Sequence, residues 1–327
     1  MRKSQYSERG PVPQDVIDVV DFQLPDTVPP GHARVEVLAA PVNPSDVLTL
    51  TGQYGILPPL PAVGGNEGVG RVIALADDVS TLAMGQTVLL PLGCGTWISH
   101  LDLPARQLVT LPNEADPVQL AMLTVNPPTA SLLISEFVDL RAGDWVIQNA
   151  ANSAVGGYLI DLAKLRGLRT VNVVRRASAL DDAVRGDIAL VDGPDLAQRV
   201  REATGNADIR LGIDAVGGEA TEHLGACLAH GGQLVNYGAM SGQACQLSPK
   251  ALIFRAITLR GFWVSSWFKS ASPEQRARLF GELTAAIANG TLSAKIQATY
   301  PLARIKDAVE AAASGERSGK VVVLPNA

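Results

Sequence analysis

The chain has 327 residues, of which 47% are hydrophobic and 18% charged, and its formal net charge is −5. This length predicts about two domains, and the balance of residue types excludes an intrinsically disordered chain. The net negative charge, without a run of lysines or arginines, argues against a nucleic-acid partner. The longest apolar runs are strand-sized and broken by glycine or proline, so we expect no membrane-spanning helix.

Two further features bear on the compartment. The N-terminus, MRKSQYSERGPVPQDV, is basic at its start, but no apolar stretch follows as it would in a secretory signal. The three cysteines, Cys94, Cys227 and Cys245, lie far apart and form no C-x-x-C pair. They predict neither a disulfide framework nor a structural zinc lobe. We therefore expect a cytoplasmic protein.

The first part of the chain, residues 1–115, is predicted to be rich in β-strands. The turn Pro29-Pro30-Gly31 separates the first two expected strands. The expected strands are Val16–Phe22, His32–Ala40, Val69–Ala76, Thr87–Pro91 and Gln107–Leu111. Short strands spaced by glycine and proline turns predict a small barrel-like β domain.

Residues 116–259 follow a different pattern, in which strands alternate with helices. The expected helices are Pro117–Glu136, Ala154–Leu165, Pro194–Ala203 and Glu219–Leu228. The expected strands are Trp145–Asn149, Thr170–Val174, Asp187–Val191, Arg210–Asp214 and Gln233–Tyr237. Strands of this continuous apolar type are buried on both faces, so the pattern predicts an α/β fold with a parallel, doubly wound sheet.

Residues 260–327 are expected to return to the first domain and complete it. One more strand, Ile257–Val264, leads into this segment. The elements expected after it are a helix over Pro273–Asn289, a strand over Ile296–Tyr300, a helix over Leu302–Ala313 and a strand over Lys320–Leu324.

The turn after Trp145–Asn149 is a degraded G-x-G-x-x-G motif, with Ala151 and Ser153 near the first two glycine positions and Gly156 at the last. The motif alone is weak, because many strand–helix turns carry small residues for close packing. Its context favours a dinucleotide site, since it follows a buried strand and opens a helix whose N-terminus can hold a diphosphate.

The end of the next strand indicates which dinucleotide is bound. An NAD-dependent protein places an acidic residue there, whereas this chain has Arg175 and Arg176. Two guanidinium groups suit a 2′-phosphate and predict NADPH as the cofactor. The alternative is a pair of solvated surface arginines.

Eight segments of the chain carry a family resemblance: AAPVNPSD (39–46), TGQYGILPPLPAVGGNEGV (51–69), GTW (95–97), VNPPTA (125–130), VIQNAANSAVG (146–156), NVVRR (172–176), NYGAM (236–240) and LRGFWVSSW (259–267). In their order and spacing they resemble the zinc-independent medium-chain dehydrogenase/reductases, in particular the mitochondrial-type trans-2-enoyl thioester reductases and their bacterial relatives. The resemblance implies a GroES-like β-rich catalytic domain, a Rossmann cofactor domain and NADPH-dependent reduction of a trans-2-enoyl thioester.

The resemblance also assigns site residues and a partner. Tyr54 corresponds to the catalytic tyrosine, which would protonate the substrate; without the resemblance, the residue would be interpreted as an amphipathic turn residue. The positions expected to contact the cofactor are Asn126, Asn152, Ser153, Ala154, Val155, Arg175, Arg176, Tyr237, Gly238, Ala239, Met240, Phe262, Trp263, Val264 and Lys320. The strand Ile257–Val264 would pair with its twin in a homodimer.

No metal is expected in the site. Zinc-dependent relatives offer a cysteine and a His-Glu pair where this chain reads Asn43-Pro44-Ser45-Asp46 and Asn66-Glu67. Catalytic zinc is held largely by thiolate and imidazole groups, and neither is present there. We interpret Asp46 and Glu67 as capping or hydrogen-bonding residues, because both follow turn-forming partners.

Two alternative functions stay open. One is a quinone or other electron-poor alkene reductase on the same scaffold, in which the tyrosine would matter little. The other is a non-catalytic NADPH-binding protein. The chain also departs from the family pattern between Arg176 and Asp187, where it is shorter and lacks the usual Gly-Ala-Asp.

Overall fold

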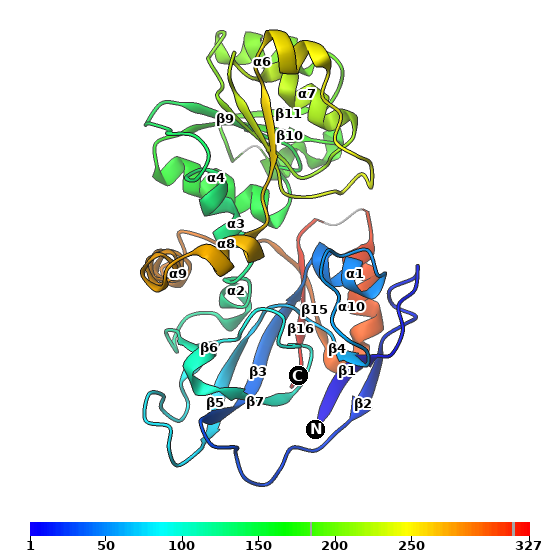
Figure 1. The fold of residues 1–327 in the computed structure, drawn as a ribbon, viewed down its shortest axis with the longest axis vertical. Coiled ribbons are helices and arrows are strands. Elements are labelled where there is room, and N and C mark those ends of the chain that lie inside the picture. The colour runs from blue at the N-terminus through cyan, green and yellow to red at the C-terminus, as the bar shows by residue number, and fades with distance from the viewer. Residues whose placement is uncertain (184, 316–317) are drawn as a thin grey trace. The chain divides into compact units, whose positions relative to one another are not determined.

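The structure of the protein is a computed structural model, which describes residues 1–183, 185–315 and 318–327. The chain forms two compact units (Figure 1). Unit 1 combines Met1–Val125 with Phe280–Ala327, and unit 2 is Asn126–Leu279. Within the described residues, no helix is long and apolar enough to cross a membrane.

Unit 1 is built on a seven-stranded sheet with the order β15-β16-β3-β5-β6-β8, in which β7 also pairs with β3. A smaller sheet has the order β2-β1-β4. The strands are β1 (Arg2–Tyr6), β2 (Asp18–Asp21), β3 (His32–Val42), β4 (Ala62–Val63), β5 (Val69–Leu75), β6 (Thr87–Leu89), β7 (His100–Pro104), β8 (Val109–Thr110), β15 (Ile296–Pro301) and β16 (Lys320–Leu324).

The long strand β3 organises this unit, because β5, β7 and β16 all pair with it. Its first residues alternate between buried and half-buried, as expected for a strand with one face on a core. Trp97 and Tyr6 are the largest side chains fully buried in that core. The helices of unit 1 are α1 (Pro44–Leu50), α2 (Pro117–Leu120) and α10 (Ile305–Ala313), and α9 (Pro273–Ala288) crosses the boundary between the units.

Unit 2, green to gold in Figure 1, contains a six-stranded parallel sheet with the order β11-β10-β9-β12-β13-β14 and helices packed against it. Its strands are β9 (Trp145–Gln148), β10 (Arg169–Val174), β11 (Ile188–Val191), β12 (Leu211–Asp214), β13 (Gln233–Asn236) and β14 (Thr258–Gly261). Its helices are α3 (Asn126–Leu133), α4 (Ala154–Leu165), α5 (Leu180–Ala183), α6 (Leu196–Thr204), α7 (Glu219–Cys227) and α8 (Val264–Ser270). The central strands β9 and β12 are buried throughout, which explains their continuous apolar sequences.

The predicted α/β fold class is confirmed, but two predicted elements are wrong. The single helix expected over Pro117–Glu136 is two helices, α2 and α3. Pro127 and Pro128 have no amide hydrogen to donate and disfavour helix in the preceding residue, so they suit the first turn of a new helix. The strand expected over Ile257–Val264 ends at Gly261, and Val264 begins α8.

The division into units also differs from the expected boundaries at 115/116 and 259/260. The structure divides the chain at 125/126 and 279/280. Helix α2 stays with unit 1 because it packs on β3 and β5. Strand β14 and helix α8 stay with unit 2 because β14 extends the parallel sheet beside β13. Val184, in the shortened segment between Arg176 and Asp187, lies outside the described residues.

Candidate active site

The glycine-motif turn connects β9 to α4. Ala150 adopts a positive φ of 47°, which reverses the chain directly after the strand. Gly156 packs so closely that a Cβ atom there would lie 2.6 Å from the carbonyl oxygen of Ala151. Ser153 is the N-cap of α4, and its Oγ accepts a hydrogen bond from the Gly156 amide at 3.1 Å. The amides of the first turn of α4, including those of Ala154 and Val155, are left without partners inside the helix, as an anion site requires.

Two buried amide side chains hold this turn against the sheet. Gln148 and Asn172 face each other on β9 and β10, and Nε2 of Gln148 donates to Oδ1 of Asn172 at 2.8 Å. The same Nε2 donates to the Gly156 carbonyl at 3.0 Å, which ties β9 to α4. This pair was not predicted, although amide side chains within or at the end of an apolar buried strand are a recognisable signal.

The segments that follow the other parallel strands contain most of the remaining predicted cofactor residues. Exposed Arg175 and half-buried Arg176 follow β10. Tyr237–Met240 follow β13, and Phe262–Val264 follow β14. The carboxyl ends of parallel strands lie at one edge of the sheet, where α/β proteins bind their ligands.

Contacts within unit 2 join these segments to one another. The Tyr237 side chain hydrogen-bonds with Ser153, and burial raises the pKa of the Tyr237 phenol above its ordinary value. The amide of Phe262 donates to the carbonyl of Asn236 at 2.8 Å. The Phe262 ring makes an edge-on contact with Phe137 at 5.6 Å between centroids. The turn after β9 and the segments after β13 and β14 are therefore joined at one edge of the sheet. Two predicted cofactor residues lie elsewhere: Asn126 begins α3, and Lys320 begins β16 in unit 1.

Tyr54 lies in the loop after α1. The amides of Gln53 and Tyr54 both donate to the carbonyl of Leu48, at 2.8 and 3.1 Å, so the end of α1 holds the backbone of this loop. Gly52 supports the turn with a φ of 76°, a value that glycine adopts without strain. The position of the phenol thus depends on how α1 is anchored.

A buried polar network, formed by Asn43, Glu67 and Lys320, anchors α1. Nζ of Lys320 donates to Oδ1 of Asn43 at 2.6 Å and to the carbonyl of Val42 at 3.1 Å. Nδ2 of Asn43 donates to Oε1 of Glu67 at 2.7 Å. Lys320 is predicted as a cofactor contact, but its side chain here is 7% exposed and bound within unit 1, so that contact stays a prediction.

The second carboxylate oxygen of Glu67 binds the segment that leads into α3. Its Oε2 accepts the amides of Thr124 and Val125 at 3.1 and 2.8 Å. The next residue, Asn126, begins α3 and is itself a predicted cofactor residue, 6% exposed. One buried carboxylate therefore fixes the backbone immediately before a predicted site residue.

Asp46 stabilises the start of α1. Its Oδ2 accepts the backbone amide of Asn43, the N-cap residue, at 2.7 Å. Burial raises the pKa of Asp46 to about 7, and burial also raises the pKa of Glu67 to about 7. The interpretation of both residues as capping or hydrogen-bonding groups is confirmed by these contacts.

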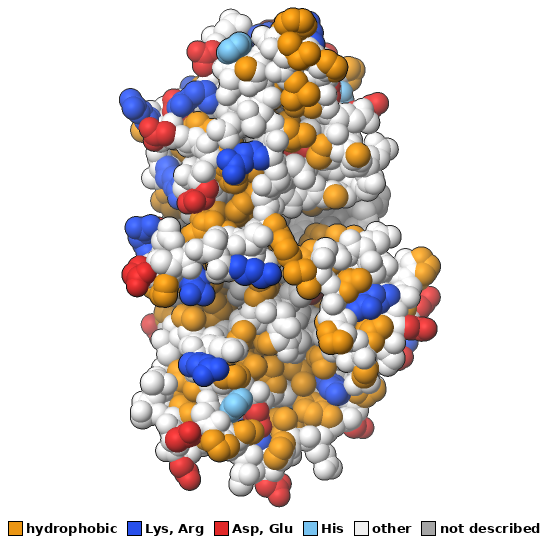
Figure 2. Space-filling view, viewed as in Figure 1, with side chains coloured by type: hydrophobic (Ala, Val, Ile, Leu, Met, Phe, Trp, Pro, Cys, Tyr) orange, Lys and Arg blue, Asp and Glu red, His pale blue; other side chains and the backbone are white. Residues whose placement is uncertain are grey.

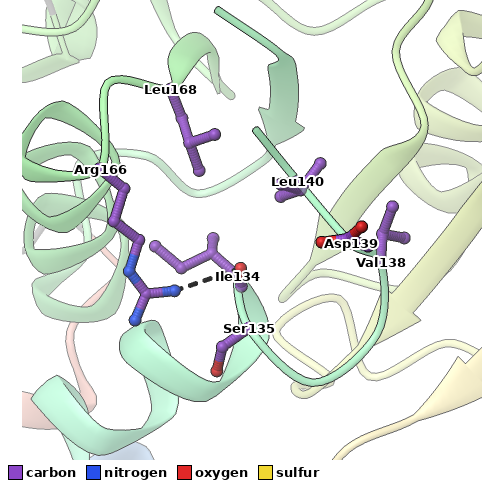
Figure 3. A pocket seen from close by; sticks show the side chains of 7 residues that line it. All are labelled: Ile134, Ser135, Val138, Asp139, Leu140, Arg166 and Leu168. Carbon is purple, nitrogen blue, oxygen red and sulfur yellow. Dashed lines mark hydrogen bonds between the residues drawn. The ribbon is translucent and has the colours of Figure 1, made fainter. Parts of the chain in front are cut away.

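A hollow of about 220 Å³ on unit 2 lies at a different place. Leu140 and Leu168, which line it, precede β9 and β10, so it opens at the amino-terminal edge of the sheet. Figure 3 shows the Arg166 side chain pointing to the carbonyl of Ile134, to which Nη1 donates at 3.3 Å. This pocket does not belong to the candidate cofactor site.

Comparisons with known proteins agree with the fold. Residues 187–323 match the family model described as zinc-binding dehydrogenase, and residues 29–113 match that of the alcohol dehydrogenase GroES-like domain. The mitochondrial enoyl-[acyl-carrier-protein] reductase of Bos taurus is 37% identical over 332 residues, covering 99% of this chain and 88% of the relative. The same protein of Homo sapiens has the same identity and coverage.

Two solved structures are also similar to this chain over almost its whole length. The complex of Etr1p with NADP and crotonyl-CoA has 25% identity, covers 99% of each chain and superposes with a TM-score of 0.88. A mycobacterial quinone oxidoreductase has 26% identity, covers 99% of this chain and 100% of its own, and has a TM-score of 0.84.

The two-unit fold and these matches define an oxidoreductase of the medium-chain dehydrogenase/reductase class. Within that class, the chain belongs to the family of the mitochondrial enoyl-[acyl-carrier-protein] reductases. The description of one family model mentions zinc, but in the described part of the chain no group of three or more His, Cys, Asp and Glu side chains could hold a metal ion.

The raised pKa of Glu67 predicts a pH-dependent stability. A carboxyl whose pKa rises from 4.5 to about 7 on folding holds its proton more tightly in the folded state. Its contribution is therefore greatest below pH 4.5 and is lost as the pH rises to about 7. We therefore expect the free energy of unfolding to fall as the pH rises through this window.

Urea unfolding at a series of pH values checks this expectation. Glu67→Gln should flatten the fall in unfolding free energy, because the amide does not ionise. Glu310→Gln, which alters an exposed side chain on α10, is the matched control and should keep the wild-type slope. Equal slopes for Glu67→Gln and wild type would show that this buried carboxyl does not control the pH dependence.

Proposed function

We propose that the protein reduces the 2,3 double bond of trans-2-enoyl thioesters, carried by CoA or an acyl carrier protein, with NADPH. The observation that carries this proposal is the edge of the parallel sheet in unit 2, where the glycine-motif turn and the segment with Arg175 and Arg176 follow neighbouring strands. Its 37% identity over 99% of the chain to mitochondrial enoyl-[acyl-carrier-protein] reductases supports the substrate class.

The residues of unit 2 fit a dinucleotide phosphate. The N-terminus of α4 suits the diphosphate, and Gly156 lets the backbone approach closely. Arg175 and Arg176 suit the 2′-phosphate, which they can bind through charge-assisted hydrogen bonds. The structure of Etr1p contains NADP, which supports the choice of the phosphorylated cofactor. When bound, NADPH supplies the hydride for the β-carbon.

Tyr54 supplies the proton in the proposed mechanism. A phenolic hydroxyl is a hydrogen-bond and proton donor at neutral pH, and it protonates the α-carbon as charge develops there. The loop that follows Tyr54 exposes three apolar side chains, Ile56, Leu57 and Leu60. An exposed apolar surface of this kind suits contact with an acyl chain.

A quinone reductase is the second candidate, and the mycobacterial quinone oxidoreductase with 26% identity supports it. Reduction of a quinone needs less help from a protein acid than protonation of carbon does. A preference for quinones over crotonyl-CoA, with no effect of Tyr54→Phe, would favour this function. Stabilisation by NADPH without turnover on either substrate would favour a binding protein.

We also propose a homodimer that forms through β14. This strand is the last of the parallel sheet, so among the described residues one edge of its backbone has no neighbouring strand. Beside it, Leu252, Ile253 and Phe254 are 46%, 69% and 75% exposed. Figure 2 shows hydrophobic side chains gathered over this gold segment of Figure 1. The Etr1p/Etr2p heterodimer of Candida tropicalis, 26% identical, supports a dimer.

Tyr54→Phe tests the proton donor. We expect kcat for crotonyl-CoA reduction to fall by about 10²–10⁴-fold, the range typical of a lost general acid. Tyr300→Phe, which removes a phenol from β15 in the same unit, should leave the rate unchanged. Stopped-flow measurement of NADPH consumption checks both variants, and an undiminished Tyr54→Phe rate would exclude Tyr54 as the acid.

Arg175→Ala tests the cofactor assignment. Loss of a charge-assisted contact should lower kcat/KM for NADPH roughly 10- to 100-fold and leave that for NADH nearly unchanged. Arg169→Ala alters the opposite end of the same strand and should keep the wild-type NADPH/NADH ratio. If Arg175→Ala keeps the wild-type ratio of kcat/KM for NADPH to that for NADH, Arg175 does not bind the 2′-phosphate.

Phe254→Glu tests the dimer. A charge on the exposed apolar segment should convert the dimer to a monomer, because burial of the ionised side chain is unfavourable. Met84→Glu, at a residue 61% exposed in unit 1, should stay dimeric. Light scattering after size-exclusion chromatography measures the mass, and a monomeric wild type or a dimeric Phe254→Glu would contradict the proposal.

A further inference from the structure

Asp214, the last residue of β12, is fully buried and accepts hydrogen bonds from five donors. Its Oδ1 accepts Nδ2 of Asn149 at 2.6 Å and the amides of Val216 and Gly217 at 2.8 and 3.1 Å. Its Oδ2 accepts Oγ1 of Thr221 at 2.8 Å and Nδ2 of Asn236 at 3.0 Å. The predicted site residues do not include Asp214.

The donors come from the segments that the sheet order brings together. Strand β12 lies between β9 and β13 in the sheet. The chain first adds β10 and β11 on one side of β9 and then adds β12, β13 and β14 on the other side. Asn149 directly follows β9, and Asn236 is the last residue of β13. Asp214 therefore lies where α/β folds bind their ligands.

Each asparagine is held by a second contact that fixes its orientation. Oδ1 of Asn149 accepts the amide of Ala215 at 2.7 Å, so its Nδ2 must face Asp214. Nδ2 of Asn236 also donates to the carbonyl of Gly238 at 2.9 Å. These two side chains connect one carboxylate to the turn that begins at Ala150 and to the segment Tyr237–Met240.

We propose that Asp214 is a positioning residue for NADPH, and this inference rests on the proposed function. Asn149 precedes Ala150, whose positive φ starts the diphosphate turn. Asn236 precedes Tyr237, whose side chain hydrogen-bonds with Ser153 in that same turn. The Asp214 carboxylate thus holds both segments through the two asparagine side chains and keeps them in the conformation that binds NADPH.

Two variants that remove one donor each from the same oxygen of Asp214 test the proposal. Asn236→Ala removes the link to the Tyr237–Met240 segment, whereas Thr221→Val removes a link to α7, outside both segments. Both should lower the apo Tm, Asn236→Ala by more, because it also removes the donor to the Gly238 carbonyl. Only Asn236→Ala should raise the Kd of NADPH, by roughly 10- to 100-fold, the range expected when hydrogen bonds to a charged diphosphate are lost.

Fluorescence titration with NADPH measures Kd, and differential scanning fluorimetry measures Tm. KM for NADPH should rise in Asn236→Ala while kcat at saturation stays near that of wild type. Asp214→Asn should raise the Kd of NADPH more than Asn236→Ala does. The NH₂ group of the new asparagine would face a hydrogen-bond donor, from which it cannot accept. If Asp214→Asn does not fold, the comparison of Asn236→Ala with Thr221→Val still tests whether Asp214 positions the cofactor segments.

Equal Kd values in Asn236→Ala, Thr221→Val and wild type would overturn the positioning role alone. Equal weakening in both variants would also overturn it, since the loss would then follow general stability. A wild-type protein that does not bind NADPH would refute both this inference and the proposed function.

Discussion

A carboxylate removed from water must be met by donors from the protein, and both units of this chain are organised around that constraint. In unit 1, Glu67 accepts from Asn43 and from the amides of Thr124 and Val125. In unit 2, Asp214 accepts from the ends of β9 and β13. In each unit one donor directly precedes a predicted site residue, Val125 before Asn126 and Asn236 before Tyr237, so hydrogen bonding to a buried carboxyl group also fixes the backbone there.

The same constraint accounts for the buried ammonium group of Lys320, which donates to Asn43 and to the carbonyl of Val42. Lys320 lies within hydrogen-bonding distance of Asn43, which binds Glu67. This buried network orients α1, and α1 holds the backbone of the Tyr54 loop through Leu48. In our account, Tyr54 then acts as a proton donor whose position is set by packing and hydrogen bonds.

The sequence predicts those features that depend on neighbouring residues. The bounds of α4 and β16 agree with their predicted ranges because a serine cap and a β-branched run are local signals. The hydrogen-bonding role of Asp46 follows from its turn. The Lys320–Asn43 contact joins residues 277 positions apart, and only the folded sheet brings them together. Asp214 was missed, although polar residues at the ends of three apolar strands, Asn149, Asp214 and Asn236, signal a shared network.

Isotope transfer during a single turnover tests most directly the proposal that NADPH reduces the 2,3 double bond of an enoyl thioester. The protein would be mixed with crotonyl-CoA and NADPH that carries deuterium at the transferable C4 position, in ordinary water. Our account predicts butyryl-CoA with deuterium on the β-carbon and a solvent-derived proton on the α-carbon. Unlabelled product, deuterium on the α-carbon, or no butyryl-CoA alongside rapid reduction of a quinone would contradict it.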